Sequence, residues 1–416
     1  MKIKKFAGII CLTSALLVAG CTSAVPEKSP SRNQPTGSQL ENKIPWVATK
    51  NTTRINTSDP FEAAVMVSKT IWTSTNDQSR PGGVVLVNPD DWQSALVSTD
   101  LIHFPNNGPV LFSRQDQIPD VTINELKRLN PIGSPQNQNI QVILVGNFDK
   151  NVEEQIKSLE FKFDRIQGKN PADYAKAIDA YYAKVAGSVP QSVIIGSMDS
   201  PDFTLPATNW IAHMPEPLLY VKKDEIPQET NDALKTRNGQ ANIYLLGPEL
   251  VVSSNVEQQL KQYGKVTRIS GNDPYENAIA FAKFKDSATQ FGWGITSPGH
   301  NVSFMVIGSP ALAIAQTPFS HMGKHAPLLW TGQDKMPSPV MSYLMSIQPK
   351  YKLSPAEGPY NHAWITGDQN TMTSNAQAEI DSMLEITSES GGGHGNMGGM
   401  DNNKQTDSTQ MPGMKH

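Results

Sequence analysis

One ordered set of motifs occurs three times along the chain, and this repetition limits the possible folds more than any other feature. Each copy opens with an arginine beside an isoleucine. It continues with a Val- and Ile-rich run, a run that begins with proline, a third apolar run closed by glycine, and a final helical stretch. The opening arginines are Arg54, Arg165 and Arg268. A sequence of this kind is expected to fold as three copies of one structural unit.

Each copy has the pattern of alternating strands and helices. The apolar runs are short and continuous, which is typical of strands that are covered on both faces. They alternate with stretches of helical period, so each copy is predicted to form a βαβα unit with a parallel sheet and right-handed crossovers. A capping residue followed by proline marks one helix start in each copy. These capping residues are Asp59, Asn170 and Asp273.

The runs that begin with proline read GPVLFS, EPLLYV and APLLWT, and their prolines are Pro109, Pro217 and Pro327. We predict that each run forms a strand at the same place in its unit. The fold class that follows is α/β, with three tandem parallel-sheet repeats in a pseudo-three-fold arrangement. A disordered N-terminal linker and a disordered C-terminal tail are expected to flank the repeats.

The N-terminal end has a different pattern. Three lysines precede a short apolar run that ends in LVAGC, which is the layout of a secretory signal too short to cross a bilayer as a mature helix. This ending resembles the lipobox of bacterial lipoproteins, in which the cysteine at the position of Cys21 becomes the lipid-modified first residue. The alternative is an ordinary signal peptide in which Cys21 is incidental. The resemblance implies an extracytoplasmic protein, held to the cell membrane by its lipid and facing the cell wall.

The boundaries between segments follow from these patterns. Residues 22–43 and the segment from Ser388 onward are rich in small and polar residues, so they are predicted to be unstructured. We divide the chain into a lipoprotein signal peptide (1–20), a tether (21–50), three repeats (51–162, 163–265 and 266–387) and a Gly/Met/His-rich tail (388–416).

The composition and the motif search argue against several function classes. The chain has 35 basic and 39 acidic residues, whereas a nucleic-acid-binding protein would show a basic surplus. It contains no G-x-S-x-G, H-E-x-x-H, Walker or G-x-G-x-x-G motif. Processing would remove Cys11 and attach lipid to Cys21, which leaves no thiol for catalysis or for a disulfide. We therefore expect a binding protein and not an enzyme.

The order of the motifs resembles the cell wall-binding repeat 2 family (CWB2) of Gram-positive surface proteins. That family has an R-I-x-G-x-D-R-Y opening, a P-I-L-L strand, an I-L-G-G strand and a V-S-x-x-V-E-x-x-L helix. The best match is YLLGPELVVSSNVEQQLKQYGKVTRISG, Tyr244–Gly271, and the resemblance extends over residues 54–384. It implies a compact pseudo-trimer that binds an anionic cell-wall polymer, partly through residues around the P-I-L-L strand. Two features depart from the family: Pro60 and Pro274 replace its D-R-Y arginine, and the first repeat has no glycine in its opening.

The three arginines and three prolines are the candidate ligand-binding residues. Guanidinium groups suit bidentate contacts with phosphate or carboxylate, so Arg54, Arg165 and Arg268 are candidates for contact with the polymer. The alternative is structural, with each arginine paired to acids or carbonyls where two repeats join. Pro109, Pro217 and Pro327 are candidates because the resemblance places polymer contacts beside their strands.

Histidine and methionine are concentrated near the C-terminal end. The motif HMGKH, His321–His325, has the spacing of a helical metal pair, but its glycine indicates a loop with surface histidines. The tail has methionines with no apolar neighbours to pack against, and thioether sulfur is a ligand selective for Cu(I). The sequence thus predicts a possible Cu(I) site, with low-complexity drift as the alternative. Its candidate ligands are His394, Met397, Met400, Met411, Met414 and His416.

Overall fold

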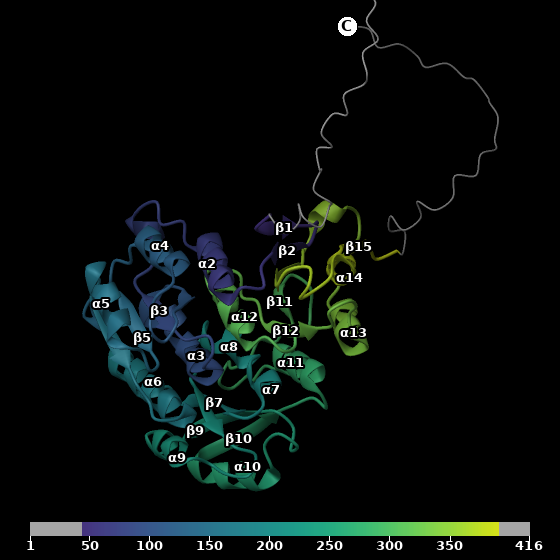
Figure 1. Cartoon of the computed structure of the whole chain (residues 1–416). Helices are drawn as coiled ribbons and strands as arrows, with labels where there is room; N and C mark the ends of the chain where they lie inside the picture. Colours follow the sequence, from purple (N-terminus) through teal and green to yellow (C-terminus); the bar gives the residue numbers. More distant parts are fainter. Residues whose placement is uncertain (1–43, 391–416) are drawn as a thin grey trace, which may run out of the picture. The chain divides into compact units, whose positions relative to one another are not determined.

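The computed structural model describes residues 44–390, which hold the three repeats (Figure 1). The signal segment and most of the tether and of the tail lie outside the described residues, so the predictions made for these parts remain predictions. No helix in the described part of the chain is long and apolar enough to cross a membrane.

Three parallel sheets of the same design form the framework of the fold, which confirms the predicted α/β class. Each has an edge strand led by proline, then the Val- and Ile-rich strand, then the strand closed by glycine, then an Arg-Ile strand. The first sheet is β4 (Val110–Phe112), β3 (Val84–Val87), β5 (Val142–Val145) and β6 (Phe163–Ile166). The second is β8 (Leu218–Val221), β7 (Ser192–Ser197), β9 (Ala241–Leu246) and β10 (Gly264–Ile269). The third is β12 (Leu328–Thr331), β11 (Asn301–Val306), β14 (His362–Thr366) and β2 (Thr52–Ile55), with β1 (Trp46–Ala48) antiparallel to β2.

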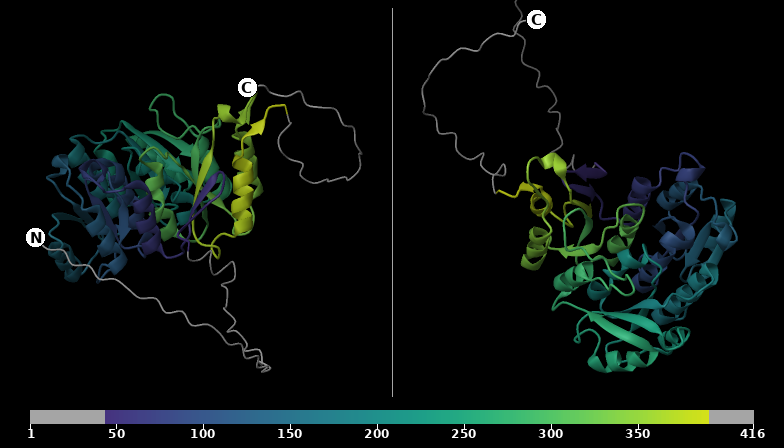
Figure 2. Two further views of the ribbon diagram at one scale, coloured as in Figure 1. Left: turned by 90° about the horizontal axis from the view of Figure 1, so that it is seen from above. Right: turned by 180° about the vertical axis from the view of Figure 1, so that it is seen from behind.

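Each Arg-Ile strand lies in the sheet of the preceding repeat. Strand β6 pairs with β5, and β10 pairs with β9, so the second and third repeats each give their first strand to the sheet before. The first repeat gives β2 to the third sheet, where it pairs with β14. The register is the same each time, with Arg165 opposite Leu144, Arg268 opposite Leu245 and Arg54 opposite Ile365. The exchange therefore closes the three repeats into a ring, and the purple N-terminal strands lie beside the yellow C-terminal helix in Figures 1 and 2.

The proline-led strands occupy equivalent edges, as the sequence predicts. The carbonyl of each proline accepts a hydrogen bond from the neighbouring central strand: Val85 N to Pro109 O at 3.0 Å, Ile194 N to Pro217 O at 2.9 Å, and Ser303 N to Pro327 O at 2.8 Å. Because the contact is the same in all three sheets, the predicted pseudo-three-fold relation between the repeats is confirmed.

The predicted helix starts are also confirmed. Asp59 accepts hydrogen bonds from the first turn of α2 (Pro60–Ile71), Asn170 from α6 (Pro171–Ala186) and Asp273 from α11 (Pro274–Lys283). Each of these helices packs against the proline-led strand of its own repeat, so it links two neighbouring sheets. The other helices of at least seven residues are α3 (Trp92–Ser98), α4 (Asp120–Leu129), α5 (Lys150–Ser158), α9 (Gln228–Lys235), α10 (Ser254–Leu260), α13 (Ser338–Ser346) and α14 (Ser374–Leu384).

Three short helical segments bring the repeats together at the centre of the ring. They are α3 with the 3-10 turn η2 (Thr99–Leu101), α8 (Ala207–Ile211), and α12 (Pro310–Ala315) with the 3-10 turn η6 (Thr317–Ser320), and they contact one another. Each carries a fully buried threonine, Thr99, Thr208 or Thr317, whose hydroxyl donates to a carbonyl of its own segment. With no bulky side chain at this position, the segments can approach closely.

Two glycines allow the chain to pass close to a helix start just after an Arg-Ile strand. A Cβ added to Gly271 would lie 2.3 Å from the backbone carbon of Glu276, and one added to Gly168 would lie 2.7 Å from the nitrogen of Tyr174. The first repeat has Thr57 at this place, which is the departure seen in its sequence.

We expect Gly271→Ala to lower the free energy of unfolding by about 2–3 kcal/mol, because the clash is with backbone atoms that cannot rotate away. Urea denaturation of the purified chain measures this. The control is Gly239→Ala, where φ is +74° and no atom lies within 4 Å, so only left-handed strain of about 1 kcal/mol is added. An equal loss in both variants would contradict the steric explanation.

Candidate functional site

Arg54 is fully buried where the ring closes. Its guanidinium donates to the carbonyls of Gly367 at 3.0 Å, Asp368 at 3.0 Å and Met372 at 2.7 Å. Its Nε donates to Oε1 of Gln377 at 2.7 Å. These partners belong to the turn and helix that follow β14, so Arg54 holds the first repeat to the third. The position favours the structural alternative for this arginine.

The other two arginines make similar contacts but are less buried. Arg268 donates to the carbonyl of Gly247 at 2.7 Å and pairs with Glu257, and its side chain is 14% exposed. Arg165 donates to the carbonyl of Phe148 at 3.4 Å and pairs with Glu153, and its side chain is 25% exposed. All three arginines thus bind the turn after the glycine-closed strand, and their role in ligand binding stays a prediction.

The three candidate prolines are buried under their own loops. Pro109, Pro217 and Pro327 each precede an edge strand whose residues are buried. Their rings are therefore not available to a polymer in the described structure, although the loops before them are partly exposed.

Two polar hollows open where an Arg-Ile strand ends, and we call them the junction crevices. The first, of about 480 Å³, lies between Asn147 after β5, Gln167 and Lys169 after β6, and Asp91 after β3. The second, of about 420 Å³, includes Pro248 after β9 and Asn272 after β10, with Lys283 of α11. Crevices outside the carboxyl ends of parallel strands are the usual ligand sites of open α/β sheets.

At the third junction, the corresponding polar groups hydrogen-bond within the protein. The hydroxyl of Ser58 donates to the carboxylate of Asp368, which also accepts from the backbone of Asn370 and Thr371 at 3.0 Å. Thr57, in the place of the glycines, donates its hydroxyl to Glu62 at 2.9 Å. The acid at the helix start is paired at the other two junctions as well, where Asp173 accepts from Lys169 N and Glu276 accepts from Asn272, so the contact of Ser58 with Asp368 is what distinguishes the third junction.

The first crevice presents both hydrogen-bond donors and acceptors. Asn147, Gln167 and Lys169 are exposed, while the ring of Tyr174 forms part of the wall. Burial raises the pKa of Tyr174, so its phenol stays protonated at neutral pH. Such a lining suits hydroxyl and acidic groups, which are the polar groups of an anionic wall polymer.

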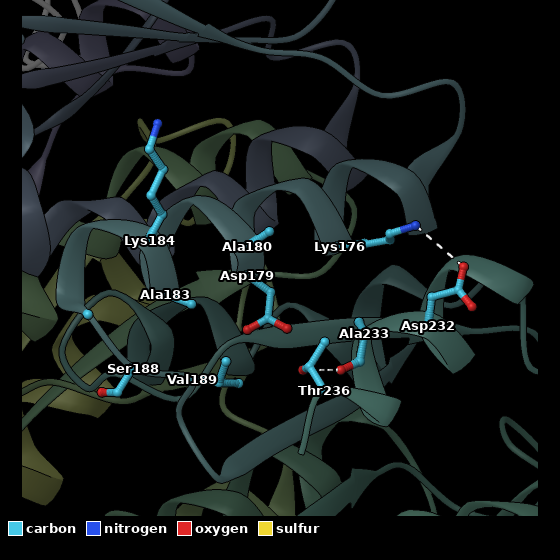
Figure 3. A pocket seen from close by; sticks show the side chains of 11 residues that line it. Lys176, Asp179, Ala180, Ala183, Lys184, Ser188, Val189, Asp232, Ala233 and Thr236 are labelled. Carbon is cyan, nitrogen blue, oxygen red and sulfur yellow. Dashed lines mark hydrogen bonds and ion pairs between the residues drawn. The ribbon is translucent and has the colours of Figure 1, made fainter. Parts of the chain in front are cut away.

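A third hollow, of about 410 Å³, lies between α6 and α9 and is shown in Figure 3. Its walls include Ala180, Ala183 and Val189, and Lys176 pairs with Asp232 across its rim at 3.4 Å. Asp179 lies at its base, where both of its oxygens are bound by the buried Arg237 at 2.9 Å. Because its charged groups other than Lys184 are paired, this hollow offers less to a polar polymer than the junction crevices do.

Four histidines gather beside the central segments, one or two from each repeat. His103 Nδ1 lies 3.1 Å from His321 Nδ1, and His213 Nε2 lies 3.1 Å from His325 Nδ1. The sequence predicted surface histidines in HMGKH; this is correct for His325 and wrong for His321, which is only 7% exposed. Burial, followed by the neighbouring imidazoles, lowers the pKa of His213 and of His321 to about 4.

Comparison with solved structures finds two proteins that share this fold. No family model matches the chain. Cwp6 from Clostridium difficile superposes with a TM-score of 0.64 and 20% identity over 80% of this chain and 48% of its own. Cwp8 from the same organism gives 0.60 and 18% identity over 81% and 52%. The chain has the CWB2 fold.

Two curated proteins of Bacillus subtilis (strain 168) are similar in sequence. The Amidase enhancer is 26% identical over 297 residues, which are 70% of this chain and 36% of the relative. The N-acetylmuramoyl-L-alanine amidase LytC is 27% identical over 236 residues, or 56% and 42%. The chain thus spans less than half the length of either relative. The CWB2 resemblance drawn from the motifs is confirmed for the fold.

The remaining predicted residues lie outside the described part of the chain. They are Cys21 and the tail ligands His394, Met397, Met400, Met411, Met414 and His416, so both predictions stay untested. Within residues 44–390, no three His, Cys, Asp or Glu side chains are placed to hold one metal ion together.

The burial of the three arginines predicts unequal effects on the stability of the CWB2 ring. Arg54→Ala would leave several buried carbonyls without donors and should lower the free energy of unfolding by about 3–5 kcal/mol. Arg165→Ala, which removes a partly exposed pair, should cost about 1 kcal/mol. Urea denaturation of both variants measures the difference. Similar losses in the two variants would show that Arg54 has no special part in closing the ring.

Proposed function

We propose that this chain is a lipid-anchored surface protein whose CWB2 repeats bind an anionic cell-wall polymer without catalysis. The fold supports the proposal, since the solved structures that share it are cell-wall proteins. The two relatives by sequence are an amidase enhancer and an amidase, and each is matched over less than half its length. Amidase activity is therefore not carried over to this chain.

The observation that carries the proposal is the pair of equivalent junction crevices. Both lie at the carboxyl ends of parallel strands, both are polar, and each contains a lysine, Lys169 or Lys283. A net charge of −4 gives no general attraction for an anionic polymer, so binding would depend on such local positive groups. Two similar sites in neighbouring repeats suit a polymer that is built from repeating units.

The anchor is proposed at Cys21. Support comes from the sequence, because Cys21 directly follows a short apolar run with basic residues before it. An anchored chain would be held at the outer face of the membrane, and wall binding would then orient it.

If Cys21 carries the lipid, Cys21→Ala should move the protein from the membrane fraction to the medium, since one apolar anchor is lost. Fractionation of cells that express the full chain, followed by detection with an antibody, measures this. A Ser23→Ala variant is the control and should remain with the membrane. Membrane retention of the Cys21→Ala variant at the native level would refute the anchor.

Wall binding is tested by sedimentation of the purified chain with cell-wall sacculi. We expect binding to intact sacculi and about tenfold less binding after acid extraction of the anionic polymers. Lys169→Ala and Lys283→Ala should each weaken binding about three- to fivefold, the value of an exposed ion pair, and more so together.

The matched control is Lys127→Ala, an exposed lysine on α4 that lines none of the hollows described. It should bind as the native chain does. Equal binding to intact and extracted sacculi would reject the anionic polymer as the ligand. Equal effects of Lys127→Ala and the crevice variants would reject the crevices as the site.

A further inference from the structure

The four histidines meet where the loops before the three proline-led strands come together. His103 lies in the turn Ile102–Asn106 of the first repeat, His213 follows α8, and His321 and His325 flank a glycine-containing loop of the third repeat. The rings of His103 and His321 are 4.7 Å apart, those of His213 and His325 are 4.5 Å apart, and the two pairs touch through His103 and His213 at 6.5 Å.

In each pair, only one proton can lie between the two ring nitrogens that face each other. His321 Nε2 lies 2.9 Å from Oδ1 of Asn107, which can only accept, so the proton of the neutral ring is on Nε2. His321 Nδ1 must then accept from the Nδ1–H of His103. In the second pair, one of His213 and His325 must likewise be neutral. When both rings of a pair are protonated, two N–H groups face each other and the two rings carry like charges, so the hydrogen bond between them is lost.

The surroundings offer little to balance such charges. On α6, the ring of Tyr182 packs against Phe104, the residue after His103, with ring centroids 5.3 Å apart. Burial raises the pKa of Tyr182, so this phenol stays neutral. Glu216, after α8, accepts from Trp210 at 3.0 Å instead of from a histidine. Asp100 of η2 is buried, and Lys324, between His321 and His325, adds a positive charge. Among residues 44–390, no carboxylate hydrogen-bonds to any of the four rings.

One neighbour favours a charged ring. Trp293 stacks on His213 with ring centroids 5.8 Å apart and an angle of 9° between the planes, and an indole face attracts a cation. However, His213 Nδ1 is buried without a hydrogen-bond partner in the described structure, so a proton there would be unsatisfied. The arrangement as a whole therefore favours neutral rings.

We propose that these four histidines form a proton-sensitive clasp between the three repeats. At neutral pH, the two imidazole pairs hold the three loops together. In mild acid, the rings acquire protons, the pairs separate, and the loops 102–109, 212–217 and 320–327 open, which loosens the start of each edge strand. This device is independent of polymer binding.

The direction of the pH effect follows from the shifted groups. The closed state lowers the pKa of His213 and of His321 from 6.5 to about 4, so the open state binds protons more readily between these values. The clasp is therefore fully effective above pH 6.5 and is lost as the pH falls toward 4. Asp100 and Glu216 have the opposite effect on the clasp. Burial raises the pKa of each carboxyl group in the closed state, so acid favours the closed state at these two residues. The test must thus compare variants, not pH values alone.

Hydrogen exchange of the full chain at pH 7.5 and pH 5.0, corrected for the intrinsic exchange rate, measures the opening of the three loops. We expect protection in the loops to fall at least about tenfold at pH 5.0, since a histidine with these two pKa values changes the opening constant by about that much or more. The variant His213→Gln/His321→Gln keeps a hydrogen-bonding group in each pair but removes the two rings whose pKa is lowered, so its protection should change much less.

The matched control is His300→Gln, because burial also lowers the pKa of His300 but its ring contacts none of the four. This variant should keep the native response. Unchanged loop protection in the native chain between the two pH values would overturn the proposal, as would loss of the response in His300→Gln. A rise in thermal stability with Zn²⁺ at pH 7.5 that requires His103 and His325 would make the cluster a metal site and overturn it also.

Discussion

The exchange of Arg-Ile strands is the constraint on which the rest of the structure depends. At two junctions the exchange is local, because β5, α5 and β6, like β9, α10 and β10, follow one another in the chain. At the third junction, β2 and β14 are separated by most of the sequence. No short segment connects the two strands, so their pairing carries a larger entropic cost. The extra contacts are found there. Of the three equivalent arginines, only Arg54, at this junction, is fully buried. Asp381 also accepts a hydrogen bond here from the backbone of Asn51 at 2.7 Å.

Much of this architecture could be predicted from the sequence. The repeated motifs, the capping residues and the proline-led strands all depend on short-range patterns, and the structure confirms them. The sequence could not show which sheet an Arg-Ile strand would join. A strand that pairs within its own repeat and one that pairs with the preceding repeat need the same residues, such as the Arg268–Ile269 pair opposite Leu245 and Leu246. The repeat period of the sequence shows where each copy begins, whereas packing between the copies decides the order of the strands in each sheet.

The candidate site was harder to predict for a similar reason. The arginines were singled out correctly as equivalent, but the carbonyls that they bind belong to another part of the chain, so their burial was not visible. The histidine cluster has no spacing motif, because His103, His213 and His321 become neighbours only when three loops meet. One feature of the crevices was visible in advance. The first repeat lacks the opening glycine, and the hydroxyl of Thr57, which stands in its place, donates to Glu62.

The repeats are alike in fold, but their junctions differ in what their polar groups do. Where the ring closes without a chain connection, Ser58, Asp368 and Arg54 are all engaged with other parts of the protein. Where the chain itself connects two sheets, such pairing is not needed for closure, and polar groups such as Gln167 and Lys169 remain exposed. In the described residues, one junction therefore has polar groups engaged with the protein, and the other two have exposed polar groups beside a hollow. This difference follows from the chain connection, because only the junction between the third and the first repeat is held by strand pairing and side-chain contacts without a short connecting segment.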